Sequence, residues 1–169
     1  LHFLDFYVIV CDSRKDFLTF RETSCACRTI IGSYNNLGKV IEDDSYIVIV
    51  TSGFDSDKDA LIQVISKNVK YIGLMGTKVK IKKIFSEIRK EGISGELLKK
   101  VRAPIGLDIN SDTPEEIAVS ILGEIIEVKN KKQAKGGYPE ELLDGILETR
   151  ENGEEAVLAF GRLDGIESD

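Results

Sequence analysis

The segment Gly73–Lys78 combines residue types that suit an anion-binding site. Two glycines, Gly73 and Gly76, precede Thr77 and Lys78. Glycine lets a ligand approach the backbone, and the free N–H groups at a helix start attract anions. The lysines that crowd the first turns of the following helix oppose the helix dipole unless an anion is bound. We therefore expect a phosphate or another anion here; the alternative is a solvated basic helix face. The glycine spacing is too short for a Walker loop.

A second candidate site follows the first apolar run of the chain, where Asp12 and Arg14 stand two residues apart. In a dinucleotide-binding unit a carboxylate in this place bonds a ribose hydroxyl, and an arginine can instead meet a phosphate. The alternative is a helix cap beside a surface arginine. The glycine-rich loop that should precede the carboxylate by about 20 residues is not in this chain, which weighs against a nicotinamide site.

Asp108 lies in the apolar turn Pro104–Asp108 and is the third candidate. A carboxylate among apolar residues should be paired, face a ligand, or bond to backbone N–H groups of its own turn. No catalytic group can be assembled around it, because the chain has one histidine, His2, and no two carboxylates are spaced for acid–base work. We therefore expect a protein that holds an anionic ligand and is not an enzyme.

Composition narrows the class of protein. The net charge of −6 argues against a general nucleic-acid binder, and no apolar run approaches the roughly 20 residues that span a bilayer. The three cysteines, Cys11, Cys25 and Cys27, are an odd number without the spacing of a zinc site. Together with the absence of a signal pattern at the start, they predict reduced thiols in a cytoplasmic protein without a metal site.

Strand and helix patterns alternate along the chain. Strands are predicted at Phe6–Cys11, Thr29–Ile31, Tyr46–Thr51 and Tyr71–Met75. Helices are predicted at Lys58–Lys67 after a cap at Asp57, at Lys78–Glu91 after a cap at Thr77 or Gly76, at Gly95–Lys100, and from Pro114 after a capping box of Thr113 and Glu116. This alternation indicates an α/β fold with a Rossmann-like parallel sheet flanked by helices, which binds ligands at the carboxyl ends of its strands.

The chain is expected to divide near residue 130. Residues 1–130 form the Rossmann-like domain. Residues 131–169 are expected to hold a polar linker, a helix over Pro139–Arg150, and the start of an incomplete second segment with a strand at Ala156–Phe160.

Several segments together resemble one protein family. They are Val8–Arg14, Tyr46–Thr51, Tyr71–Lys78, Ala103–Asp108 and Asp112–Ala118. Over about Leu4 to Lys129 the chain is similar to the C-terminal Rossmann-like domain of the xanthine dehydrogenase accessory factors (the XdhC/CoxI type). The last two segments are the most specific to that family, whereas the alternating strands are generic.

The resemblance implies a maturation factor rather than an enzyme. Such a factor binds the molybdenum cofactor (molybdopterin), assists its sulfuration and delivers it to a molybdenum hydroxylase client such as xanthine dehydrogenase, with a cysteine desulfurase as a further partner. The cofactor-binding residues that it implies are Asp12, Arg14, Gly73, Gly76, Thr77, Lys78 and Asp108. Two alternatives stay open: a fragment of an NAD(P)-binding oxidoreductase, and a nucleotide-sensing regulatory domain.

The chain also departs from the family pattern. The family's first strand and its glycine-rich loop are missing upstream of Leu1. The stretch after Thr51, which usually carries histidines in the family, has none here. A sheet without its first strand would expose two strand edges. We expect either that Ala156–Phe160 fills this gap or that the flanking strands close on each other. An exposed edge also leaves a homodimer open.

Overall fold

The computed structural model of the 169-residue chain describes residues 1, 4–14 and 26–131. These residues belong to one compact unit, Leu1–Lys132. The helix expected at 139–150 and the strand expected at 156–160 lie outside the described residues, as do His2 and Cys25.

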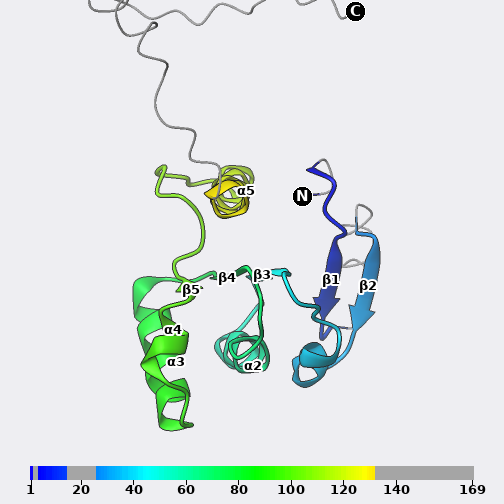
Figure 1. Ribbon diagram of the computed structural model, residues 1–169. Helices are drawn as coiled ribbons and strands as arrows, with labels where there is room; N and C mark the ends of the chain where they lie inside the picture. Colours follow the sequence, from blue (N-terminus) through cyan, green and yellow to red (C-terminus); the bar gives the residue numbers. More distant parts are fainter. Residues whose placement is uncertain (2–3, 15–25, 132–169) are drawn as a thin grey trace, which may run out of the picture. The chain divides into compact units, whose positions relative to one another are not determined.

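Parallel strands and helices alternate in this unit, which confirms the expected α/β class (Figure 1). The strands are β1 (Ile9–Asp12), β2 (Arg28–Ile31), β3 (Tyr46–Ile49), β4 (Tyr71–Leu74) and β5 (Val101–Arg102). The helices are the 3-10 helix η2 (Tyr34–Lys39) and the α-helices α2 (Phe54–Val64), α3 (Lys78–Lys90), α4 (Gly95–Leu98) and α5 (Pro114–Asn130). The sequence patterns did not predict β5 or η2.

The strands form two separate sheets within the described residues. One sheet has the order β1-β2 and the other β3-β4-β5, and every pairing is parallel. The ring of Phe6, just before β1, meets that of Tyr46, the first residue of β3, at 5.4 Å. At the opposite ends, Asp12 and Thr51 line the same cavity. The two strands therefore run in the same direction but do not pair, so the expectation that they close on each other is wrong.

The core is densest around β4. All four β4 residues are buried, and their apolar side chains pack with α2 and α3 residues that include Leu61, Ile84 and Ile88. Figure 1 shows α2, α3 and α4 on one face of the three-stranded sheet and α5 on the other. Helices on both faces explain why the β4 sequence is apolar without alternation.

The helix starts follow the expected chemistry in two cases out of three. The Thr77 hydroxyl caps α3, and Thr113 with Glu116 forms the capping box of α5. The expectation for α2 was wrong: this helix begins at Phe54 with Gly53 as its N-cap. Asp57, expected as the cap, lies inside the first turn, where its carboxylate serves the interactions described below.

Candidate functional site

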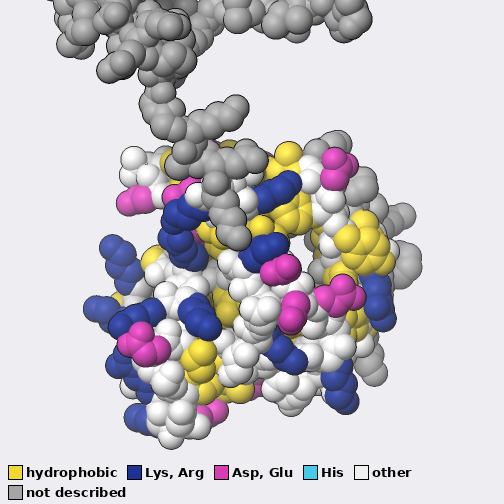
Figure 2. Space-filling view, in the orientation of Figure 1, with side chains coloured by type: hydrophobic (Ala, Val, Ile, Leu, Met, Phe, Trp, Pro, Cys, Tyr) yellow, Lys and Arg dark blue, Asp and Glu magenta, His cyan; other side chains and the backbone are white. Residues whose placement is uncertain are grey.

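A groove separates β1 from β3 and is the main candidate site. Its cavity has a volume of about 950 Å³ and is lined by both strands and by Ala60 and Val64 of α2. The space-filling view shows the surface hollowed, with hydrophobic side chains beside the opening (Figure 2). On one side the chain proceeds outward from β1 to β2, and on the other from β3 to β4 and β5. Such a reversal of direction is a topological switch point, where α/β proteins bind ligands at the carboxyl ends of the strands.

Asp12 and Arg14 lie together at the carboxyl end of this groove. The Asp12 carboxylate accepts hydrogen bonds from the Arg14 backbone N–H at 2.8 Å, from Nε at 3.0 Å and from the terminal guanidinium nitrogen at 2.7 Å. These hydrogen bonds from Arg14 lower the pKa of Asp12. The carboxylate is thus ionised and already engaged, while the Arg14 side chain keeps 60% of its surface exposed.

A buried polar cluster closes the carboxyl end of β3. The Asp57 carboxylate, 1% exposed, accepts hydrogen bonds from the Thr51 hydroxyl at 2.6 Å and from the Thr51 N–H at 3.1 Å. Its other oxygen forms an ion pair with the Lys80 ammonium group. This cluster was not anticipated, although a carboxylate four residues before the buried Leu61 could have indicated an inward orientation.

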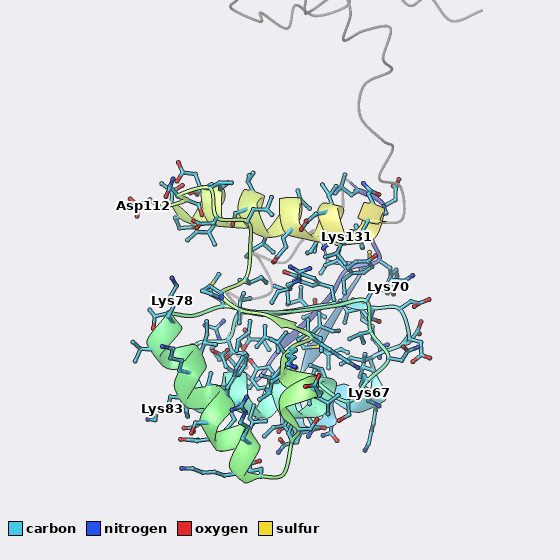
Figure 3. The ribbon with its side chains drawn as sticks, turned by 60° about the vertical axis from the view of Figure 1, so that its left-hand side comes forward. Lys67, Lys70, Lys78, Lys83, Asp112 and Lys131 are labelled. Atoms are coloured by element: carbon cyan, nitrogen blue, oxygen red, sulfur yellow. The ribbon has the colours of Figure 1, made fainter. Side chains whose placement is uncertain are left out.

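The lysines of α3 are only partly available to a ligand. Lys80 is neutralised by Asp57, and the Lys83 ammonium lies 4.7 Å from the centre of the Phe54 ring. The Thr77 hydroxyl already accepts the Lys80 N–H as the helix cap. Lys78 is exposed at the start of the helix (Figure 3). Of the predicted anion site at this junction, Lys78 is the residue best placed to meet a ligand from solvent.

Gly73 has a structural reason to be glycine. A Cβ at this position would lie 2.4 Å from the Ile105 side chain and 2.6 Å from the Tyr71 hydroxyl oxygen. The turn after β5 therefore packs directly on β4 and covers Gly73. A Cβ at Gly76 would meet the Lys80 side chain at 3.1 Å. The expectation that Gly73 borders a ligand is not supported on this face.

Asp108 does not occupy the apolar setting that its sequence neighbours suggested. Asp108 is exposed to solvent, and so are Leu107 and Ile109 beside it. The expectation that burial forces this carboxylate into a pair or toward a ligand was therefore wrong. The turn is held by its backbone instead: the Ile105 N–H donates to the Leu74 carbonyl, and the Leu107 N–H to the Ser120 carbonyl.

The carboxylate that is buried behind this turn is Glu124. Its Oε2 accepts hydrogen bonds from the Tyr71 hydroxyl at 2.6 Å and from the Gly106 N–H at 2.8 Å, and Arg102 lies 3.9 Å from its Oε1. Burial and the neighbouring Glu124 raise the pKa of Tyr71 far above its usual range. Sequence reasoning missed this cluster; the signal was an acidic residue adjacent to Ile125 on the apolar face of α5.

The structure thus gathers only some of the predicted site residues. Asp12 and Arg14 line the groove. The groove lining does not include the other five, which are Gly73, Gly76, Thr77, Lys78 and Asp108. Within the described residues, no cluster of three metal-ligating side chains occurs. None of the helices in that part of the chain has the length and apolarity that a membrane span requires.

Comparisons with known proteins agree with this architecture. Residues 1–125 match the family model of the XdhC Rossmann domain. The chain is 34% identical over 97 residues to the uncharacterized protein YqeB of Escherichia coli K12, covering 57% of this chain and 17% of that protein. It is 31% identical over 84 residues to a probable xanthine dehydrogenase subunit from Bacillus subtilis 168, covering 50% of this chain and 23% of that protein. The chain therefore spans less than a quarter of the length of these two relatives.

The fold has a counterpart among solved structures. A crystal structure of a xanthine dehydrogenase from Bacillus halodurans superposes with a TM-score of 0.65 at 24% identity, covering 84% of this chain and 40% of that one. At this identity the likeness concerns the fold. Because the family model covers most of the chain, from residue 1 to residue 125, the chain belongs to the XdhC Rossmann domain family.

Proposed function

We propose that this domain binds the molybdenum cofactor and takes part in the maturation of a xanthine dehydrogenase-type molybdenum hydroxylase. The observation that carries the proposal is the groove at the switch point between β1 and β3, in a chain whose family is that of the XdhC Rossmann domain. A cytoplasmic location, a hydroxylase client and a cysteine desulfurase partner belong to the same proposal. No residue is assigned a catalytic role.

The residues at the carboxyl end of the groove fit a phosphate-bearing ligand. Helix α2 begins there, and its N-cap Gly53 provides no side-chain hydrogen bond, whereas α3, α4 and α5 are each capped by a hydroxyl. The first backbone N–H groups of α2 therefore need an acceptor, which an anion can supply. Ser52, just before the cap, is exposed and lines the groove with Arg14. The carboxylate of Asp55 in the first turn opposes an anion, so Asp55→Asn should strengthen binding.

The molybdenum cofactor would bring a pterin ring, a phosphate and a metal oxyanion to this crevice. The chain's own contribution would be recognition. Arg14 and the start of α2 would hold negative charge, and the apolar groove would exclude water from the flat ring. Lys78 provides a second cation at the carboxyl end of β4, outside the groove lining.

A nucleotide is the second candidate ligand. Asp12 stands where a ribose-binding carboxylate is found in dinucleotide-binding units. Because Arg14 already donates four hydrogen bonds to it, a ribose hydroxyl would have to use the remaining acceptor sites of the carboxylate. This observation ranks NAD(P) and ATP below the molybdenum cofactor.

The test is a calorimetric titration of the full chain with each of four compounds: molybdopterin, NAD, NADP and ATP. We expect molybdopterin to bind at least tenfold more tightly than the nucleotides, which corresponds to about 1.4 kcal/mol. Tighter binding of a nucleotide would reject the proposal in favour of a nucleotide-binding domain. Equal affinities for all four compounds would reject both candidate ligands.

Two sets of variants then locate the anion. Arg14→Ala tests the groove, and Lys78→Ala combined with Thr77→Ala tests the start of α3. For each set, a decrease in affinity of at least tenfold assigns the phosphate to that position. Lys82→Ala, a lysine farther along α3, is the matched control and should leave the titration unchanged. Unchanged titrations with both sets would remove both assignments.

A further inference from the structure

Helix α3 differs from the other α-helices in the charge at its start. The first turns of α2, α4 and α5 contain aspartate or glutamate, whereas that of α3 has no acidic residue and contains Lys78 and Lys80. Cations at a helix N-terminus oppose the helix dipole. The like charges of Lys78 and Lys82, four residues apart, also repel each other. The stability of the helix itself therefore does not account for these lysines.

The carboxylates that lie near α3 already have partners. Lys80 forms an ion pair with the buried Asp57. Glu87 and Glu91, the acidic residues at the end of α3, both pair with Lys58 of α2, at 3.6 and 3.3 Å. The exposed cations of α3 form no ion pair among the residues that the structure describes; they are Lys78, Lys82, Lys83, Arg89 and Lys90. Their charge is therefore not neutralised within this part of the chain.

Positive charge is concentrated on this side of the unit. Residues 78–102, which run from α3 through α4 to β5, contain nine Lys or Arg and three Asp or Glu residues, although the whole chain has a net charge of −6. Figure 2 shows Lys and Arg side chains gathered over the side that α3 and α4 form in Figure 1. Such a separation of charge steers an oppositely charged partner toward one face of a protein.

The outward face of α3 has an uncharged centre line. Ile81, Ile84 and Ile88 are the buried residues of the helix. With about 3.6 residues per turn, Val79 and Ser86 lie opposite them and two turns apart. Val79 is 78% exposed, and Ser86 is exposed as well. The cations flank this line, with Lys78, Lys82 and Arg89 on one side and Lys83 and Lys90 on the other.

This pattern fits the side of another α-helix. Where two helices pack along each other, apolar or small residues repeat every seven positions, and charged residues beside them determine the choice of partner. The face from Lys78 to Lys90 is about 18 Å long, enough for a helix of three turns. A phosphate backbone would use the cations but would leave Val79 without an apolar contact. A helix with acidic residues on both sides of an apolar line would meet both features.

We propose that the outward face of α3 docks an acidic α-helix of another protein. That helix lies along α3, places an apolar residue at every seventh position against Val79 and Ser86, and carries glutamate or aspartate beside the flanking cations. The attraction is mainly electrostatic, so association is fast and weakens with salt. No residue of α3 lines the groove between β1 and β3, so the proposal does not depend on the ligand of that groove.

The first test compares three fluorescein-labelled peptides of three heptads, added to the full chain and followed by anisotropy. One peptide repeats Leu-Gln-Ala-Glu-Glu-Ala-Glu. The second has glutamine in place of every glutamate, and the third keeps the glutamates but has a helix-breaking proline in its middle heptad. We expect the first peptide to bind at least tenfold more tightly than either of the others. If the proline peptide binds as tightly as the first, charge alone is recognised and the proposal is wrong.

Matched lysine substitutions then locate the binding face. Lys67 and Lys70 precede β4, whereas α3 follows it (Figure 3). Lys82→Gln combined with Lys90→Gln should weaken binding of the first peptide at least tenfold. Lys67→Gln combined with Lys70→Gln removes the same charge and should change it less than twofold. Equal losses would show a response to net charge and would contradict the proposal. Lys78 and Thr77 stay unchanged, so this outcome is separate from that of the proposed cofactor site.

A valine substitution separates docking from stability. Val79→Glu places an acidic residue in the first turn of α3, so the urea midpoint should stay equal or rise. Binding of the acidic peptide should nevertheless fall at least tenfold. Val119→Glu is the control, at a residue of α5 that is 61% exposed, and should leave binding unchanged. Unchanged binding in Val79→Glu would overturn the proposal.

Other polyanions provide the remaining outcome. A short duplex DNA and vesicles that contain phosphatidylserine are added to the full chain at physiological salt. We expect both to bind more weakly than the first peptide, because the net negative charge of the chain repels them and neither supplies a contact for Val79. Tighter binding of the DNA or of the vesicles would identify a general polyanion site and overturn the proposal.

Discussion

Two regions of the molecule differ in how completely their hydrogen-bonding groups and apolar surfaces are covered. One is the corner formed by β4, β5 and α5, and the other is the groove between β1 and β3. At the corner the polar groups are buried and hydrogen-bonded. The Glu124 carboxylate accepts hydrogen bonds from the Tyr71 hydroxyl and the Gly106 N–H, and the positively charged Arg102 lies nearby. Along the groove, apolar strands stay half-exposed and backbone groups lack a partner strand among the described residues. The polar groups of the corner are satisfied within it, whereas the strands beside the groove stay open within the described part of the chain.

The largest effect should come from removing the carboxylate at the corner. Glu124→Ala leaves the Tyr71 hydroxyl and the Gly106 N–H buried without an acceptor. We expect a loss of about 4 kcal/mol in the free energy of unfolding, measured with urea. Asp108→Ala, at an exposed carboxylate, is the control and should change stability by less than about 0.5 kcal/mol. A loss below about 1 kcal/mol for Glu124→Ala would show that the corner is less complete than we infer.

Crowding at Gly106 should have the next largest effect. Gly106 has φ +96°, and a Cβ there would lie 2.5 Å from the Ser120 hydroxyl oxygen. Gly92 has nearly the same φ, +94°, with no atom near its Cβ. We expect Gly106→Ala to cost about 3 kcal/mol and Gly92→Ala about 1 kcal/mol, because only the former adds a clash to the backbone strain.

A double variant separates the clash at Gly106 from the strain. Ser120→Ala removes the hydroxyl that the new methyl group would meet. In that background, Gly106→Ala should cost about 1 kcal/mol less than in the unsubstituted chain. Equal costs in both backgrounds would attribute the effect to the backbone alone.

Equal side-chain truncations compare the two regions directly. Ile72 in β4 is buried, whereas Ile9 in β1 is half-exposed. Ile72→Val should lower the free energy of unfolding by about 1 kcal/mol, and Ile9→Val by about 0.3 kcal/mol, since less apolar surface is withdrawn from water at Ile9. Equal costs for the two variants would mean that β1 is covered as fully as β4.

The smallest effect concerns acid at the groove rim. Because Arg14 lowers the pKa of Asp12, the folded chain holds fewer protons there than the unfolded chain. The contribution of this pair to stability is complete above the unfolded pKa of about 4 and is lost as the pH falls through the lower folded pKa. Exposure of Arg14 limits it to less than about 1 kcal/mol.

Urea midpoints measured between pH 7 and pH 3 test this prediction. The decline toward acid pH should be shallower in Asp12→Asn. Glu116, whose pKa is lowered by the N–H groups of Asp112 and Thr113, should keep part of the decline in that variant. An unchanged acid profile in Asp12→Asn would show that the Asp12–Arg14 pair contributes nothing measurable.

The elements of this fold could largely be predicted from the sequence because their signals are local. The capping box at Thr113 and Glu116 and the cap at Thr77 depend on residues three positions apart. The start of α2 could not be placed in this way, because Asp57 looks like a cap in sequence and is turned inward by Thr51 and Lys80. The two-residue strand β5 is too short to carry a pattern of its own.

The candidate site was less predictable because its residues meet through long-range packing. Asp12 and Arg14 were recognised from a local motif, and the structure places them on the groove. Whether Lys80 is free depends on Asp57, 23 positions earlier in the sequence. Likewise, Gly73 suggested an open backbone, but Ile105 from a distant turn covers it. The sequence signals residue types, and the tertiary structure determines which of them remain open to a ligand.

The hydroxyl of Tyr71 also has an optical consequence. The chain has five tyrosines and no tryptophan, so its near-ultraviolet emission comes from tyrosine alone. The fluorescence of a phenol is weak while its hydroxyl donates a short hydrogen bond to a carboxylate, as that of Tyr71 does to Glu124. The fluorescence increases when this hydrogen bond breaks. Release of α5 from β4 should therefore brighten the protein, which gives a label-free signal for the moment when this helix detaches.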